Sequence, residues 1–185
     1  MLVLRPAHLG DVEAIVELVE SAYRGDASRA GWTTEADLLD GQRTDAAAVG
    51  ALVERHDGCV LLAFSGARLL ASCELARHDD GSAYFGMFAV RPGLQGGGLG
   101  GRVLAAAERF ARGNWKSSRM SMTVLAQRPE LIAWYERRGY RRTGAVKPFP
   151  YGDERLGIPR RDDLEFAVLE KWMDLDPDER ATADA

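Results

Sequence analysis

The sequence predicts a mixed α+β fold in a single domain. The chain has 185 residues, of which 46% are apolar and 28% charged, and this is the size and composition of one globular domain with a buried core. Strand-like segments joined by hairpin turns fill the middle of the chain, and two helical segments alternate with the later strands, so we expect a mixed sheet. One domain should cover residues 1–173, followed by an acidic, flexible tail over 174–185.

The first part of the chain predicts a strand followed by helices. Pro6 ends a short apolar run, Asp11 is a residue type that begins helices, and apolar residues then recur at helical spacing to about Tyr23. Asp45 can cap a later helix. The expected elements are a strand over 2–5, a helix over 11–23, a helical piece over 35–39 and a helix over 45–56.

The middle of the chain has the pattern of consecutive antiparallel strands. The turn signals are Ser65-Gly66 and Asp80-Gly81, and each lies between apolar segments. Pro92 holds the preceding residue extended and closes the last strand of the group. The expected strands cover 59–64, 69–77 and 82–90.

The last part predicts two helices and three strands. Gly113 and Gly139 are expected to end the helices, and Pro129 suits the first turn of the second one. The connection over 147–163 is too long for a hairpin turn, so it is a candidate functional segment. The expected elements are a helix over 99–113, a strand over 120–124, a helix over 129–139 and strands over 140–143 and 164–170.

Charge is unevenly distributed along the chain. Residues 1–90 contain 7 basic and 14 acidic side chains, whereas residues 91–142 contain 11 basic and 3 acidic ones. The basic segment could bind a polyanion while the acidic half faces a cation, or it could simply form arginine-rich helix surfaces. The overall charge of −4 argues against a nucleic-acid partner.

Glycine is concentrated at the start of the basic segment. Seven of the 20 glycines lie between Gly86 and Gly101, where a strand gives way to a helix. A helix start offers unpaired N–H groups and the positive end of the helix dipole, and glycine lets a phosphate come close to them. The loop therefore predicts a phosphate-binding site.

Two common phosphate motifs fit this loop poorly. A P-loop needs Lys and then Ser or Thr after its last glycine, and Gly101 is followed by Arg102. Gly96, Gly98 and Gly101 match the dinucleotide pattern, but no acidic residue follows about 20 positions later to bind a ribose. A nicotinamide-dependent enzyme is thus a weak alternative.

A third motif fits in detail. Gln95, Gly98 and Gly100 match the pattern [QR]-x-x-G-x-[GA], and the run over 87–100 resembles the acyl-CoA-binding motif of the GNAT-type N-acetyltransferase superfamily. The run over 133–140, Ala-Trp-Tyr-Glu-Arg-Arg-Gly-Tyr, is similar to that family's second signature. The resemblance implies a mostly antiparallel central sheet with helices on both faces and a V-shaped split between two central strands. It also implies acetyl-CoA as the acyl donor and no metal.

The resemblance implies which residues bind the cofactor. Main-chain groups of the strand before the loop would pair with the pantetheine arm, amides of the loop would hold the pyrophosphate, and nearby arginines would bind phosphate. The first group is Phe88, Ala89 and Val90, the second Gln95, Gly96, Gly97, Gly98, Leu99, Gly100 and Gly101, and the third Arg102 and Arg138, with Arg91 and Arg137 as further candidates.

The same resemblance implies that Tyr135 is the catalytic acid. A phenol close to the leaving sulfur can donate its proton as negative charge develops there. The alternative is that Tyr135 only packs on the apolar face of its helix. Arg128 stands where the family often has Asn, so cofactor contacts at that position are open.

The general base is less clear from the sequence. Many family members carry Glu on the strand before the loop, and Gly86 occupies that position here. An amine arrives mostly protonated, so another group must take its proton. Glu74 is the first candidate, a chain of ordered water is the second, and Glu35 or Asp37 could act from the N-terminal region.

We expect an N-acetyltransferase that acts by direct attack of a primary amine, on a small molecule or a peptide, in a ternary complex. The alternative is a module that binds or senses acyl-CoA without efficient catalysis, and Gly86 favours it. The segment over 147–163 could close over the acceptor or bind its carboxylate. Its candidate residues are Phe149, Tyr151, Arg160 and Arg161.

The remaining expectations concern location and assembly. The longest apolar run, Cys59 to Phe64, has six residues and is far too short to span a bilayer, so no membrane partner is expected. Cys59 and Cys73 lack metal-ligand spacing and should be reduced thiols in the cytoplasm. An exposed final strand would allow a homodimer.

Overall fold

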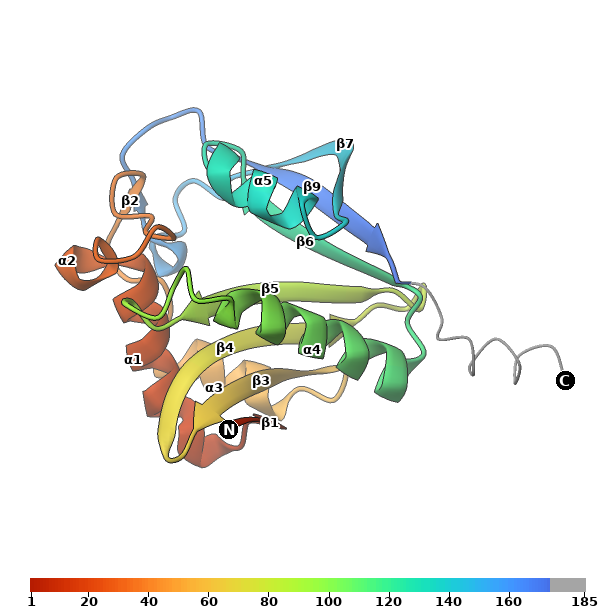
Figure 1. Cartoon of the computed structure of the whole chain (residues 1–185). Coiled ribbons are helices and arrows are strands. Elements are labelled where there is room, and N and C mark those ends of the chain that lie inside the picture. The colour runs from red at the N-terminus through yellow and green to blue at the C-terminus, as the bar shows by residue number, and fades with distance from the viewer. Residues whose placement is uncertain (174–185) are drawn as a thin grey trace, which may run out of the picture.

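The computed structural model describes residues 1–173, and the predicted tail over 174–185 lies outside this range (Figure 1). The elements are β1 (Leu2–Pro6), η1 (Leu9–Asp11), α1 (Val12–Tyr23), α2 (Gly25–Ser28), β2 (Leu39–Asp40), α3 (Ala46–Glu54), β3 (Gly58–Ser65), β4 (Arg68–Arg77), β5 (Ala83–Val90), α4 (Leu99–Trp115), β6 (Arg119–Leu125), α5 (Pro129–Glu136), β7 (Arg141–Pro148), η2 (Glu154–Leu156), β8 (Ile158–Pro159) and β9 (Glu165–Trp172).

The main sheet has seven strands in the order β1-β3-β4-β5-β6-β9-β7. All neighbours are antiparallel except β5 and β6, which are parallel and pair only where Ala83 meets Met120 and Tyr84 meets Ser121. Beyond these positions the two halves of the sheet diverge, as Figure 1 shows. The predicted mixed, mostly antiparallel sheet with a V-shaped split is confirmed.

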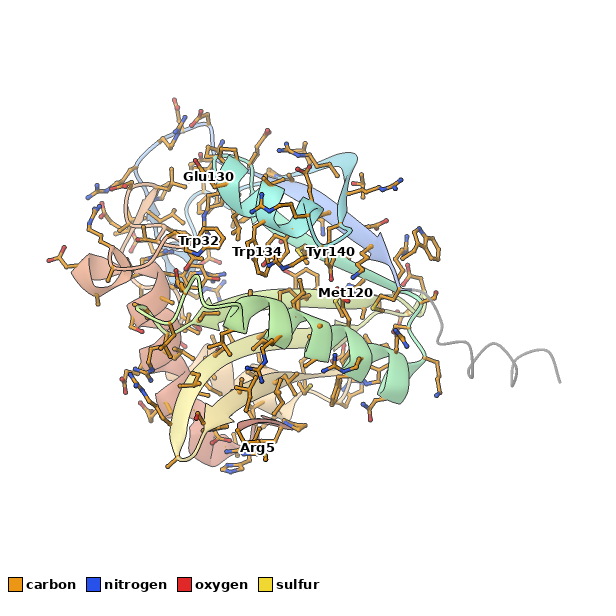
Figure 2. All side chains as sticks on the ribbon, viewed as in Figure 1. Arg5, Trp32, Met120, Glu130, Trp134 and Tyr140 are labelled. Carbon is orange, nitrogen blue, oxygen red and sulfur yellow. The ribbon has the colours of Figure 1, made fainter. Side chains whose placement is uncertain are left out.

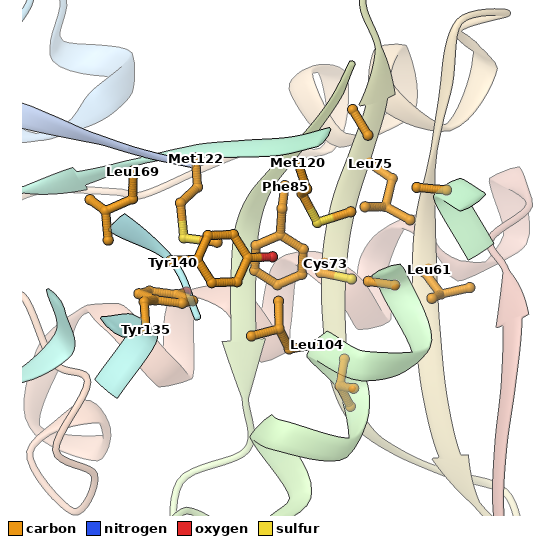
Figure 3. Close-up of a cluster of buried hydrophobic side chains, with 14 of the residues drawn as sticks. Leu61, Cys73, Leu75, Phe85, Leu104, Met120, Met122, Tyr135, Tyr140 and Leu169 are labelled. Atoms are coloured by element: carbon orange, nitrogen blue, oxygen red, sulfur yellow. The ribbon is translucent and has the colours of Figure 1, made fainter. Parts of the chain in front are cut away.

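Helices cover both faces of the sheet, as predicted. On one face α1 and α3 pack on β3 and β4, with Ile15, Val49 and Leu62 fully buried. On the other face α4 and α5 cover a core that spans both halves of the sheet. Figure 3 shows this core, in which Tyr135 and Tyr140 lie beside Phe85 and Met122.

Some element boundaries differ from the sequence prediction. The helix α4 continues past Gly113 to Trp115, and Lys116, with φ 56°, ends it in the left-handed conformation. The helical piece predicted over 35–39 is shortened to one hydrogen-bonded turn, in which Leu38 and Leu39 donate to the carbonyl of Glu35, and Leu39 and Asp40 form the short strand β2, which pairs with β8. This pairing supplies backbone partners within the long connection between β7 and β9.

A bulge interrupts β5 near the split. Ser72 lies opposite Ala89 and Glu74 opposite Gly86, so two residues of β5, Met87 and Phe88, face one residue of β4. Met87 has φ 40°, an uncommon conformation for a residue with a side chain. A bulge bends its strand and redirects the neighbouring groups, and here it lies where β5 leaves β6.

Candidate functional site

The split in the sheet contains two cavities that meet. The larger has a volume of about 380 Å³ and lies between α5, the glycine loop and Trp32. The smaller, about 200 Å³, lies between the ends of β5 and β6 and the loop that contains Glu35 and Arg43. Tyr23, Phe88, Leu131 and Tyr135 line both. Two molecules bound in these cavities would therefore touch near Tyr135.

The glycine loop lines the larger cavity at the start of α4. Gly98 precedes the helix with φ 79°, a conformation that glycine adopts without strain. The first-turn amides of α4 have no carbonyl partner within the helix and are free to bind an anion. A Cβ on Gly100 would lie 3.4 Å from the Trp134 ring, so small residues keep this wall of the cavity open.

Arg138 adds positive charge to the same cavity. Its guanidinium lies 3.6 Å from the centre of the Trp134 ring and donates a hydrogen bond of 2.8 Å to the carbonyl of Trp134. Burial and the neighbouring Arg137 lower the pKa of Arg138 from its usual value. Two arginines at the end of α5 thus face the glycine loop across the cavity.

The structure brings most, but not all, of the predicted cofactor residues to this cavity. Phe88, Val90, Gln95, Gly96, Gly98, Gly100, Gly101 and Arg138 line it. Gly97, Leu99 and Arg102 line a separate groove near Met1 and Leu2. Arg91 donates a hydrogen bond of 3.0 Å to the carbonyl of Leu69, and Ala89 lines neither cavity.

The main chain of β5 shows why Ala89 differs from its neighbours. Arg91 donates its N–H to the carbonyl of Leu70 at 2.8 Å, which makes the Ala89–Ser72 pair a bonded pair of the β4–β5 ladder. The carbonyls of Phe88 and Val90 instead face the opening. The Tyr23 hydroxyl donates to the carbonyl of Phe88, and Gln95 Nε2 donates to that of Val90 at 3.1 Å.

Gln95 also holds the loop that carries Trp32. Its Oε1 accepts the N–H of Trp32 at 2.9 Å, and its Nε2 donates to the Thr33 hydroxyl at 2.8 Å. The ring of Trp32 lies 6.3 Å from that of Trp134, and both lie in the opening of the sheet (Figure 2). Sequence reasoning missed this loop, because no motif marks it.

Tyr135 lies where the cavities meet and is only 4% exposed. Aromatic rings surround it, with centroids at 5.0 Å for Trp134, 5.8 Å for Tyr140 and 6.5 Å for Phe85. Burial raises the pKa of Tyr135 well above its usual value. The phenol therefore keeps its proton at neutral pH and can donate it.

Gly86 has a steric role in the smaller cavity. A Cβ at this position would lie 2.5 Å from the Tyr84 ring, which no side chain could tolerate without a shift. The Tyr84 hydroxyl lies 3.2 Å from the Thr123 hydroxyl of β6, so Tyr84 links the two halves of the sheet. The ring thus occupies the space next to Gly86 where many members of the resembled family place a carboxylate.

The structure does not bring Glu74 into either cavity. Glu74 lies opposite Gly86 in the β4–β5 register, but its carboxylate accepts a hydrogen bond of 2.9 Å from Arg55. Burial raises the pKa of Glu74, an effect that Arg55 reduces. Asp37 is paired with Arg29 at 2.9 Å and is exposed, which leaves it away from the site.

Glu35 is the one carboxylate of the smaller cavity among the described residues. Its Oε2 accepts from Arg24 at 2.7 Å and its Oε1 from Arg128 at 3.1 Å. Burial alone would raise the pKa of Glu35, but Arg43, Arg128 and Arg24 together outweigh it and lower the pKa. Arg128 therefore serves as a partner of Glu35, and it also donates to the carbonyl of Thr33 at 2.6 Å.

The long connection over 147–163 contributes less to the site than predicted. Phe149 packs against Leu39 and Phe166, at the edge of the smaller cavity. Arg160 pairs with Asp40 at 2.8 Å, and Arg161 pairs with Asp163, both on exposed surface. These two arginines are therefore engaged outside the cavities.

Metal-binding clusters and membrane-spanning helices are both absent from residues 1–173. No group of three or more His, Cys, Asp or Glu side chains there could hold a metal ion. No helix in that range is both long and apolar enough to cross a bilayer.

Comparison with known proteins gives a family match and many similar folds. Residues 12–140 match the model of the acetyltransferase (GNAT) family. No curated protein matches the sequence. A putative phosphinothricin N-acetyltransferase is 15% identical with a TM-score of 0.69, covering 95% of this chain and 100% of its own.

Two other solved structures are similar over nearly their whole length. The ribosomal-protein-S18-alanine N-acetyltransferase from Escherichia coli is 14% identical with a TM-score of 0.66, covering 95% of this chain and 96% of its own. A putative acetyltransferase from Salmonella typhimurium, solved with its cofactor acetyl-CoA, is 18% identical with a TM-score of 0.68 and the same coverage, 95% and 96%. At such identities the similarity shows the fold.

The contact between Gly86 and Tyr84 gives a testable prediction. Gly86→Ala should lower the free energy of unfolding by about 1–3 kcal/mol, because the new methyl group displaces the Tyr84 ring. In a Tyr84→Ala background the same substitution should leave the free energy of unfolding almost unchanged. A double-mutant cycle measured by denaturant unfolding separates the clash with Tyr84 from the other effects of the substitution. Gly50→Ala in α3, where a Cβ meets nothing within 4 Å, is the matched control. Additive effects of the two substitutions would contradict the steric explanation.

Proposed function

Because this chain belongs to the GNAT family of acetyltransferases, we propose that it is an N-acetyltransferase that moves the acetyl group of acetyl-CoA to a primary amine. The observation that supports this proposal is the junction of the two cavities at Tyr135. One cavity is lined by glycine amides and arginines, which suits a diphosphate. The other opens onto the opposite side of the junction and would hold the acceptor.

The residues of the larger cavity fit coenzyme A. The amides at the start of α4 would bind the pyrophosphate, with Arg138 as a further phosphate ligand. The carbonyls of Phe88 and Val90 would pair with the pantetheine arm, since they face the opening, whereas Ala89 would not. Each carbonyl has a second lone pair and can accept from pantetheine beside its present donor.

The proposed reaction is a direct attack in a ternary complex. The amine nitrogen uses its lone pair to form a bond to the acyl carbon, and the bond from that carbon to sulfur breaks. Tyr135 donates its proton to the sulfur as the electron pair leaves with it. A general base takes the proton that the amine loses and solvent returns a proton to the tyrosine, so the protons balance and no covalent acyl-enzyme is needed.

Glu74 is the proposed acceptor of the amine proton, and it acts through water rather than by direct contact. Its position opposite Gly86 and its raised pKa support this role. Glu35 suits the role less well, because its arginine partners stabilise the charged form and weaken it as a base.

A second function has one observation in its favour. No carboxylate that lines the smaller cavity, among the described residues, is free of arginine partners. A protein that binds acyl-CoA as a sensor would need no such base. Tight binding of CoA without acetylation of any amine or peptide would favour this alternative.

The free thiols of Cys59 and Cys73 support a cytoplasmic location, where thiols stay reduced. Burial raises the pKa of Cys59 to about 11, so it stays protonated and unreactive. The edge strand β7, exposed along its length, supports assembly into a homodimer, which sedimentation would detect.

Arg138→Gln tests the cofactor site. The substitution should raise the Kd for CoA by about 10-fold, the effect of losing one charged hydrogen bond. Binding of pantetheine, which lacks the phosphates, should change little. Calorimetry with both ligands checks this, and Arg109→Gln on the exposed face of α4 is the matched control. Equal losses for CoA and pantetheine would argue against a phosphate contact.

Tyr135→Phe tests the proposed acid. The variant keeps the ring and its packing but has no proton to donate, so kcat should fall by about 100-fold or more. The Kd for CoA should stay within a factor of about two. Thiol release from acetyl-CoA measures the rate, and Tyr151→Phe outside both cavities is the control. Unchanged turnover in Tyr135→Phe would remove Tyr135 from the mechanism.

Glu74→Gln tests the proposed base through the pH profile. A base must be deprotonated to act, so kcat/KM of the native protein should rise as pH increases through the raised pKa of Glu74. The Glu74→Gln variant should lose this rise of kcat/KM with pH and should have a lower kcat/KM at neutral pH. If both proteins follow the same pH profile, the base is another group.

A further inference from the structure

The smaller cavity has a positive balance of charge. The charged side chains that line it are Glu35, Arg43 and Arg128. Arg24, which does not line the cavity, also binds Glu35. One carboxylate thus faces three guanidinium groups. The acidic first half of the sequence suggested a cationic acceptor, but the side chains at the site have the opposite balance.

Two of the three arginines bind Glu35 directly. Arg24 and Arg128 each bind one oxygen of Glu35, and Arg128 also binds the carbonyl of Thr33. All three groups are nearly buried, with side chains 6–9% exposed. This cluster is a fixed structural link, and Glu35 has little capacity left to bind an ammonium group.

Arg43 is different. Its side chain is 27% exposed, and its Nε lies 3.9 Å from Glu35, beyond hydrogen-bond distance. Its guanidinium lies 5.5 Å from the centre of the Tyr23 ring. Within residues 1–173 no side-chain hydrogen bond uses its donors, although the ion pair and the ring hold it in place. Such a planar fork can bind a carboxylate through two parallel hydrogen bonds.

The neighbourhood of Arg43 is apolar. A small annex of about 50 Å³ adjoins Glu35 and Arg43 and is otherwise lined by Leu39, Leu125, Phe149 and Phe166. The two volumes together, about 200 and 50 Å³, suit a molecule of amino-acid size. An extended polyamine would place positive charge against the arginines.

We infer that the acceptor is a small free amino acid with an apolar side chain, whose carboxylate binds Arg43. Its side chain enters the annex, and its amine points toward Tyr135, at the junction with the cofactor cavity. This inference rests on the proposed acetyl transfer and names its substrate class. Arg43 is then the residue that distinguishes an amino acid from an amine without a carboxylate.

The experiment compares matched acceptors. Thiol release from acetyl-CoA is followed with L-leucine, with L-leucinamide and isoamylamine, which lack the carboxylate, and with spermidine. The native protein should prefer L-leucine by about 10-fold or more in kcat/KM, the effect of one charge-assisted bidentate contact. Arg43→Gln should remove this preference, mainly by raising KM for L-leucine, while kcat/KM for isoamylamine changes by no more than about two-fold.

Two variants control for folding and for charge. Arg43→Lys keeps the charge but loses the planar fork, so its preference for L-leucine should lie between those of the native protein and Arg43→Gln. Arg160→Gln, outside both cavities, should behave as the native protein does. Higher activity on spermidine or isoamylamine than on L-leucine would overturn the inference, as would equal losses on all acceptors in Arg43→Gln.

A binding measurement separates this inference from the proposed function. Calorimetry of N-acetyl-L-leucine, in the presence of CoA, reports on the carboxylate site without any turnover. Binding that is lost in Arg43→Gln supports the site even if no acetylation is observed, in which case only the proposed transfer fails. Absence of binding to the folded, CoA-saturated native protein overturns the inference.

Discussion

The short contact between β5 and β6 is the constraint on which the rest of the structure depends. These strands pair at two positions, so side chains must hold the two halves of the sheet together beyond them. Tyr84 reaches Thr123 on one side of the opening, and Arg128 joins the start of α5 to Glu35. The aromatic core around Tyr135 closes the other face. A split that exposes main-chain groups is thereby made compatible with a stable fold.

The same links determine the chemistry of the opening. Glu35 is buried, and a buried carboxylate without partners would be strongly destabilising, so its arginines are a structural requirement. Because these arginines compensate its charge and stabilise its ionised form, Glu35 is a weak base. Tyr84 occupies the space beside Gly86 for a comparable reason, since it spans the opening. The positions that hold the sheet together are thus not available to bind a cation or to take a proton.

Local patterns predicted the order of elements, the glycine loop and the position of Tyr135, because periodicity and helix-start chemistry depend on near neighbours. The partners of Glu35 could not be predicted in the same way, since Arg128 lies 93 positions later in the sequence. Summed charge was misleading for Arg43, because an average over 90 residues does not show which side chains face a cavity. The sequence did contain one signal for the Tyr84 ring beside Gly86: the two residues lie two positions apart on a strand and therefore share a face of the sheet.

The carbonyls of Phe88 and Val90 explain how the opening can be stable without a ligand. Tyr23 and Gln95 donate to them, so these two acceptors are paired within the protein. A pantetheine arm that pairs here adds to, or replaces, a hydrogen bond that already exists, and such an exchange yields little net free energy. In the proposed site, most of the affinity for CoA would then come from charged contacts at the glycine loop and Arg138, together with apolar contact at Trp134. Main-chain pairing along β5 would set the position of the thioester relative to Tyr135 rather than the strength of binding.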